Sequence, residues 1–277
     1  MKIGAMIESF RLGFKEAAHA AKAVGADGVQ AYASGVIHAD MTDAEIAEVR
    51  RILDGEGLVF SAICGDFGCR MFYRPDECRD LIEKEKRVML TAKKLGTDVV
   101  TTHIGAVPDD TGCPQYETMH KVCRELADFA DSVGGRFAVE TGPEKSAVLK
   151  AFLDSLGSRG VSVNLDPANL VMCAGDDPVE AVYNLRDYIV HTHAKDGVNK
   201  FRVDTRRIYA AEYFGLEPAP AGSYLEVPLG EGGVPWKKYI AALKDIGYDG
   251  YLTIEREVGD DPSRDIKIAA DFLRTLI

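Results

Sequence analysis

The sequence lacks the features that mark several large classes of protein. No stretch approaches the roughly 18 apolar residues of a membrane span, and the first residues form no signal-peptide-like apolar run. The six cysteines are scattered and include no CxxC pair. We therefore expect a soluble cytoplasmic protein with reduced thiols and no membrane partner.

An excess of basic charge is also missing. The formal net charge is -11, which argues against a protein that binds a phosphate backbone, although a local basic patch could coexist with this total. We find no low-complexity tract and no internal repeat beyond the strand–helix unit described next.

Short apolar runs alternate with longer amphipathic ones along all 277 residues. We expect strands at residues 2–7, 28–32, 58–63, 98–102, 136–140, 161–165, 188–193 and 250–255. We expect helices at residues 13–24, 42–55, 75–95, 116–133, 144–156, 178–185, 235–246 and 262–276.

Eight such units with short connections predict a parallel sheet, because parallel neighbours need crossover helices. Eight strands suit closure, so the predicted fold is an α/β protein of the (β/α)8 TIM-barrel type, one domain over residues 1–277. An open, doubly wound sheet is the alternative, but no glycine-rich turn follows the first strand. The long irregular segment 197–234 lies on the rim, where we expect a lid or a substrate-contacting loop.

Four ligand-type side chains end four consecutive predicted strands. Glu140, Asp166, His193 and Glu255 end the fifth, sixth, seventh and eighth strands. In a barrel these carboxyl ends meet at one rim. A buried carboxylate must be paired, protonated or bound to a metal. His191 lies one pleat deeper than His193, where a hydrogen-bonded structural role is expected.

Three carboxylates and one imidazole form a hard, mixed ligand set. Such a set suits Mn, Mg or Co and also tolerates Zn. Each residue alone has a structural explanation, as a salt-bridge or capping residue. Their coincidence on four consecutive strands favours a divalent metal site over a polar structural cluster.

Four segments give the chain a family resemblance. They are Val139–Thr141, Asn164–Asn169, His191–Asp196 and Leu252–Glu257. Together they resemble the xylose-isomerase-like TIM-barrel superfamily, which contains the sugar phosphate isomerases and epimerases. The resemblance covers essentially the whole chain, and these motifs are more specific for the superfamily than for a substrate.

The resemblance implies a reaction as well as a fold. It implies that the metal binds to the four residues above, and that Glu140 and Glu255 flank a sugar and move a proton through an enediolate. A divalent-metal-dependent sugar isomerase or epimerase, with manganese among the suitable metals, is therefore expected in carbohydrate metabolism. A lyase or dehydratase acting on a keto-sugar or cyclic polyol, and a non-catalytic sugar-binding barrel, remain open.

The chain departs from the ketose 3-epimerases at three positions. Asn169 stands where those enzymes have a histidine, Ser146 where they have a second glutamate, and Asn199 where they have an arginine. A free ketohexose substrate is therefore doubtful. Asn169 remains a predicted substrate contact.

The superfamily also includes apurinic endonucleases with three zinc ions. His103 stands where those enzymes have a ligand on the fourth strand, but the third strand ends without a histidine and Asn169 replaces another. The incomplete ligand set and the negative charge argue against a nuclease and against a nucleic-acid partner. His103, Lys195 and Glu8 are predicted contacts of a small-molecule sugar. Each also has a structural alternative: a plain structural role for His103, neutralisation of the acidic site for Lys195, and hydrogen bonding at the rim for Glu8. The sequence leaves the oligomeric state open, a homo-oligomer included.

Overall fold

Eight parallel strands form a closed barrel in the computed structural model, which describes residues 1–68 and 71–277. Around the barrel the order is β1-β10-β7-β6-β5-β4-β3-β2. The barrel strands are β1 (Lys2–Met6), β2 (Gly28–Tyr32), β3 (Val59–Cys64), β4 (Val99–Thr102), β5 (Arg136–Glu140), β6 (Val161–Leu165), β7 (Ile189–Ala194) and β10 (Tyr251–Ile254). Since β1 pairs with both β10 and β2, the barrel prediction is confirmed and the open sheet is wrong.

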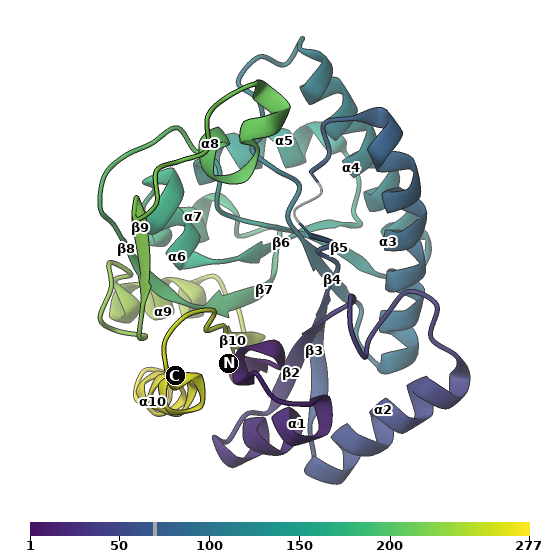
Figure 1. The fold of residues 1–277 in the computed structure, drawn as a ribbon, viewed down its shortest axis with the longest axis vertical. Coiled ribbons are helices and arrows are strands. Elements are labelled where there is room, and N and C mark those ends of the chain that lie inside the picture. The colour runs from purple at the N-terminus through teal and green to yellow at the C-terminus, as the bar shows by residue number, and fades with distance from the viewer. Residues whose placement is uncertain (69–70) are drawn as a thin grey trace.

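The helices form a ring outside the barrel (Figure 1). They are α1 (Phe14–Ala23), α2 (Asp43–Glu56), α3 (Pro75–Leu95), α4 (Pro114–Ser132), α5 (Ser146–Leu156), α7 (Pro178–Asn184), α9 (Trp236–Asp245) and α10 (Pro262–Arg274). Local chemistry sets several of the boundaries. Thr42 and Glu45 form a capping box at the start of α2, and a proline opens α3, α4, α7 and α10, where a missing N–H costs nothing.

The segment predicted to be irregular is partly ordered. β8 (Asp196–Asn199) pairs antiparallel with β9 (Tyr224–Val227) outside the barrel, and α8 (Arg206–Tyr209) and the 3-10 helix η3 (Ala211–Phe214) lie between them in sequence. Three short elements were also not predicted: η1 (Glu8–Phe10), α6 (Pro167–Asn169) and η2 (Leu170–Ala174). In Figure 1, the β8–β9 ribbon lies at the left, beside α6.

The inside of the barrel is polar below its carboxyl rim. Gln30, Thr101, Asn164, His191 and Thr253 are each at most 1% exposed, and they are joined by hydrogen bonds. A Cβ on Gly4 would lie 2.4 Å from Thr253 Oγ1, so only glycine fits there. Apolar side chains of the helices and of the outer strand faces make up the hydrophobic core.

Two sequence expectations can be compared directly with the structure. Within residues 1–68 and 71–277, no helix combines the length and apolar character needed to cross a membrane. Cys64, Cys113, Cys123 and Cys173 are free thiols. Cys69 lies outside the described residues.

Candidate metal centre and active site

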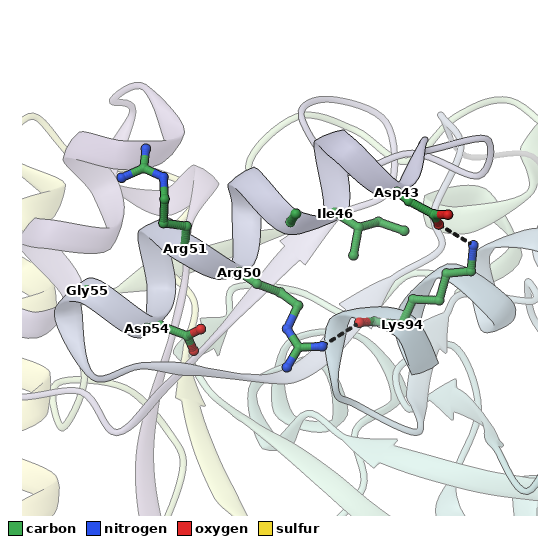
Figure 2. A pocket seen from close by; sticks show the side chains of 8 residues that line it. Asp43, Ile46, Arg50, Arg51, Asp54, Gly55 and Lys94 are labelled. Atoms are coloured by element: carbon green, nitrogen blue, oxygen red, sulfur yellow. Dashed lines mark hydrogen bonds and ion pairs between the residues drawn. The ribbon is translucent and has the colours of Figure 1, made fainter.

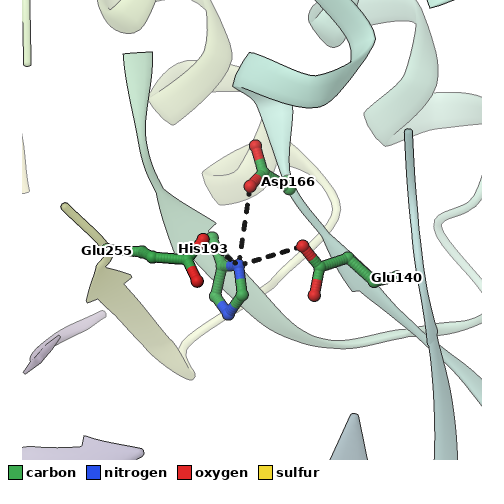
Figure 3. Close-up of side chains that lie close together, drawn as sticks. All are labelled: Glu140, Asp166, His193 and Glu255. Carbon is green, nitrogen blue, oxygen red and sulfur yellow. Dashed lines mark ion pairs between the residues drawn. The ribbon is translucent and has the colours of Figure 1, made fainter. Parts of the chain in front are cut away.

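The four predicted ligand residues meet at the carboxyl rim of the barrel (Figure 3). One ligand atom from each of Glu140, Asp166, His193 and Glu255 lies within 4.8 Å of the others, and all four residues are buried. His193 Nδ1 lies at the centre, 3.3 Å from Glu140 Oε1, 3.5 Å from Asp166 Oδ2 and 3.3 Å from Glu255 Oε2. The structure therefore assembles the predicted set, while metal binding by it stays a prediction.

A hydrogen-bond chain across the barrel fixes the orientation of His193. The ring Nε2 lies 3.0 Å from Gln30 Oε1, and Gln30 Nε2 donates to Thr101 Oγ1 at 2.9 Å. An amide oxygen can only accept, so the contact with Gln30 requires a proton on Nε2, which Asn164 Nδ2 also approaches at 3.2 Å; Nδ1 is the ring nitrogen that faces the carboxylates. Partners of this kind commonly fix the tautomer of a metal-binding histidine.

The two carboxylate oxygens of Asp166 have different roles: one caps a helix and the other faces the cluster. Oδ1 accepts the backbone N–H groups of Ala168 and Asn169 and so caps α6. Oδ2 is buried and has no hydrogen-bond partner among the described residues, as is true of His193 Nδ1. Two buried polar atoms without hydrogen bonds, facing one another, are what a cation between them would satisfy.

The charges of the cluster also fit a cation. Burial opposes protonation, yet Glu140 and Glu255 raise the pKa of His193 well above its ordinary value. The site therefore attracts positive charge. Three carboxylates with a neutral imidazole suit a hard divalent ion with oxygen-rich coordination.

Glu140 is held by two amides. Asn164 Nδ2 donates to Oε2 at 3.0 Å, and Asn169 Nδ2 donates to Oε1 at 3.2 Å. Asn169 is predicted to contact the substrate, and this hydrogen bond shows that it also orients Glu140, a predicted metal ligand. Asn164 Oδ1 lies 2.9 Å from His191 Nδ1, which supports the expected structural role of that histidine.

Glu255 is paired with a buried lysine. Lys195 Nζ donates to Glu255 Oε2 at 3.0 Å and also to Glu257. Although burial opposes ionisation, Lys195 and His193 hold the pKa of Glu255 well below its ordinary value. Lys195 reaches the rim as predicted, with its charge already matched by two carboxylates.

His103 forms a dyad with Asp66 beside the cluster. Asp66 Oδ2 lies 2.7 Å from His103 Nδ1, while Oδ1 accepts the backbone N–H of His103 and the hydroxyl of Thr102. His103 Nε2 faces Glu140 Oε1 at 3.6 Å. Burial lowers the pKa of His103, but Glu140 and Asp66 outweigh it and raise this pKa to about 10. Sequence reasoning missed Asp66, because its pairing depends on the register between β3 and β4.

Glu8 is the first residue of η1, just after β1. Its Oε1 accepts the backbone N–H of Tyr32 at 3.1 Å. Burial of the carboxyl group raises the pKa of Glu8 to about 7, with a smaller contribution from Glu255. The side chain thus lies at the rim, within the electrostatic influence of the cluster.

A cavity of about 840 Å³ opens above the cluster. Glu140, Glu255, Lys195 and His103 line it, and residues from the segment between β7 and α9 form part of its wall. That segment is anchored at a distance from the cluster, where the Tyr73 ring lies 5.1 Å from the rings of both Tyr213 and Phe214. The prediction of a rim loop over the site is supported by this arrangement.

Tyr209 belongs to the same segment between β7 and α9, and it lines the cavity next to His103. Its ring stacks on His103 with 5.9 Å between centroids. A Cβ on Gly142 would lie 2.7 Å from Tyr209 Oη, so glycine at that position permits the close approach. The sequence offered no local signal for this contact.

A second concavity lies on the outer surface of the barrel, along α2 (Figure 2). Several of its polar side chains have partners: Lys94 pairs with Asp43 at 2.9 Å, Arg50 donates to the carbonyl of Lys94 at 3.4 Å, and Arg51 pairs with Glu48. It contains none of the strand-end residues. The cavity above the four-residue cluster is therefore the candidate active site.

Comparison with known proteins places this geometry in a family. Residues 18–276 match the family described as xylose isomerase-like TIM barrel. An inosose dehydratase from Lacticaseibacillus casei is 25% identical over 154 residues, which cover 54% of this chain and 49% of the relative. The match thus spans about half the length of that relative.

Solved structures share the fold over nearly the whole chain. A xylose isomerase domain protein from Planctomyces limnophilus has a TM-score of 0.78 and 24% identity, covering 99% of this chain and 96% of its own. The probable 3-DHS dehydratase AsbF from Bacillus anthracis has a TM-score of 0.74 at 20% identity, covering 99% of both chains. D-psicose 3-epimerase from Clostridium cellulolyticum H10 has a TM-score of 0.73 at 19% identity, covering 100% and 99%.

At these identities the structural likeness demonstrates the shared fold alone, and the family assignment comes from the match to the family as a whole. That match extends over most of the chain and includes all four strand ends of the cluster. The chain therefore belongs to the xylose isomerase-like TIM barrel family.

Proposed function

We propose that the protein is a divalent-metal-dependent sugar isomerase or epimerase. The observation that carries this proposal is the cluster of Glu140, Asp166, His193 and Glu255, with ligand atoms within 4.8 Å at the carboxyl ends of β5, β6, β7 and β10. The unpartnered Asp166 Oδ2 and His193 Nδ1 support a cation there. Mn, Mg or Co suits the ligand set, and Zn is tolerated.

A bound divalent ion would supply Lewis-acid polarisation of a substrate carbonyl. The protein would supply the proton transfers. Glu140 and Glu255 approach the cluster from β5 and β10, so one carboxylate can take a proton next to the carbonyl while the other returns it. Lys195 next to Glu255 keeps that carboxylate ionised and able to accept a proton.

The remaining predicted contacts would hold the sugar. His103, fixed by Asp66, presents Nε2 toward the cluster and suits a substrate hydroxyl. Asn169 and Lys195 also line the cavity, and Glu8 lies at the rim beside Tyr32. Their polar atoms match a small-molecule sugar or a cyclic polyol.

The second candidate is a dehydratase or lyase that uses the same proton abstraction. The Asp66–His103 dyad favours it, because an aspartate-oriented imidazole can protonate a departing hydroxyl group. Similarity to an inosose dehydratase and to a probable 3-DHS dehydratase points in the same direction. Product analysis separates the candidates, since isomerisation conserves mass and elimination releases water or an aglycone.

Metal content of the purified protein tests the proposal first. We expect about one divalent ion per chain, lost in the Glu140→Gln, His193→Ala double variant. Close to three zinc ions would instead support a nuclease-type centre. No metal after incubation with Mn, Co and Mg would overturn the proposal. Exchange of a substrate C–H with deuterated water would then distinguish an enzyme from a sugar-binding barrel.

A further inference from the structure

The cavity above the cluster has two chemically different parts. Its inner part is acidic and polar. Its outer part is apolar at the exposed Tyr224, Leu225 and Val258, while Met172, Ile208 and Tyr209 add less exposed apolar lining. A volume of about 840 Å³ lies in the upper part of the range for pockets that enclose drug-sized ligands. The cavity therefore has room for more than one sugar ring.

Three apolar side chains at the cavity are left open to solvent. Tyr224 is 40% exposed, Leu225 46% and Val258 44%. Tyr224 and Leu225 belong to β9, whereas Val258 follows β10, so the tertiary structure brings two segments that are distant in sequence to the same cavity. Single exposed apolar residues are ordinary, but a group lining one polar cavity indicates an apolar part of a ligand.

The charges of the described lining residues disfavour an anionic substituent. Among the described lining residues Lys195 is the only lysine or arginine, and Glu255 and Glu257 already pair with it. His103 is engaged by Asp66. A phosphate or carboxylate in the outer part would find no unpaired cation there and would face Glu257.

We propose that the substrate is a keto-sugar or keto-polyol derivative with an uncharged apolar substituent, as in an aryl or alkyl glycoside whose ring carries the carbonyl. Its carbonyl and adjacent hydroxyl oxygens lie at the four-residue cluster, and its substituent lies against the apolar lining at Tyr224, Leu225 and Val258. An aromatic substituent fits best, because it can pack against the Tyr224 ring. This inference rests on the proposed function and names its substrate class.

Matched glycosides test the inference. Binding of phenyl and methyl β-glycosides of glucose, galactose, mannose and xylose is measured by calorimetry on the full chain saturated with Mg²⁺. For at least one sugar we expect the phenyl member to bind about ten- to hundredfold more tightly, as burial of an aromatic ring implies. The Tyr224→Ala, Leu225→Ala double variant should lose this preference.

Phe201→Ala provides the matched control. Phe201 is 46% exposed in the same segment but does not line the cavity, so its removal should leave the preference unchanged. Equal affinity for both members, or no binding of either across the panel, overturns the inference. So does a double variant that changes self-association in sedimentation while keeping the preference, because the patch would then join copies of the chain.

The two proposals fail in different ways. Metal-dependent thermal stabilisation is measured on the same samples. If it persists while the aryl preference is absent, the substrate class is wrong and the metal-dependent function stands. If stabilisation is absent while the aryl preference persists, the proposed function fails and the apolar subsite remains.

Discussion

Replacing Asp166 by asparagine separates metal binding from helix capping. The asparagine side chain would keep an Oδ1 acceptor for the N–H groups of Ala168 and Asn169, so the cap of α6 should persist. It would replace the unpartnered Oδ2 by an NH₂ group, which donates hydrogen bonds and cannot bind a metal. We therefore expect metal-dependent stabilisation to fall without loss of the fold.

The magnitude follows from linkage between binding and folding. An ion at a thousandfold excess over its Kd adds about 4 kcal/mol to the free energy of unfolding. In a chain of this size each kcal/mol raises Tm by roughly 2–3 °C, so the wild-type protein should gain about 8–12 °C. With one of three carboxylate ligands removed, the Asp166→Asn variant should gain less than about 3 °C.

Thermal unfolding with chelator and with excess Mn, Mg, Co or Zn provides the assay. Asp177→Asn is the control, because Asp177 caps α7 in the same way, accepting from Val179 and Glu180 before a proline, and lies outside the cluster. This control should keep the full wild-type gain. An Asp166→Asn variant that gains as much as wild type with every metal would refute the assignment of Asp166 as a ligand.

Three further predictions concern the free energy of unfolding, measured by urea titration. Burial raises the pKa of Glu144 to about 7, so the folded state holds a proton that the unfolded chain loses, and stability falls as pH rises from about 4.5 through 7. Glu144→Gln keeps an acceptor for the Val107 N–H. Relative to wild type, its free energy of unfolding should therefore rise by about 1–2 kcal/mol as the pH is raised from 4 to 8. Parallel pH profiles of the two proteins would contradict this. Glu85 is fully buried, and neither carboxylate oxygen is hydrogen-bonded to a described residue. Glu85→Met should therefore raise the free energy of unfolding by about 1–3 kcal/mol at pH 8. A lower free energy of unfolding would contradict this interpretation. Asp196 accepts five hydrogen bonds, one of them from Trp236, the only tryptophan of the sequence. Asp196→Ala should therefore lower the free energy of unfolding by at least about 3 kcal/mol, with tryptophan fluorescence as the probe. A loss below about 1 kcal/mol would refute the structural role of Asp196.

The order of strands and helices followed from local patterns. Alternation of apolar runs with amphipathic ones depends on residues near one another in sequence, and the capping pair Thr42 and Glu45 spans only three positions. The regular elements that the sequence analysis did not predict have weak local patterns or depend on pairing between distant residues. β8 and β9 pair across residues 200–223, and no local pattern specifies which strands join over such a distance.

The sequence by itself also determined which side chains share a rim. Strand-end positions of Glu140, Asp166, His193 and Glu255 converge because every strand of a parallel barrel ends at the same edge. Tertiary structure alone decided the contacts that depend on register and on closure of the barrel. Closure brings Gln30 of β2 to His193 of β7, although neither strand neighbours the other in the sheet.

Long-range placement likewise decided the surroundings of the cluster. Asp66 reaches His103 because β3 and β4 pair in one register, and a shift would separate them. Tyr224 and Val258 reach the same cavity because the β8–β9 ribbon folds back beside the end of β10. Short-range periodicity therefore determined the elements and the rim, whereas hydrogen bonds and packing between distant segments determined the orientation of the site and the shape of its cavity.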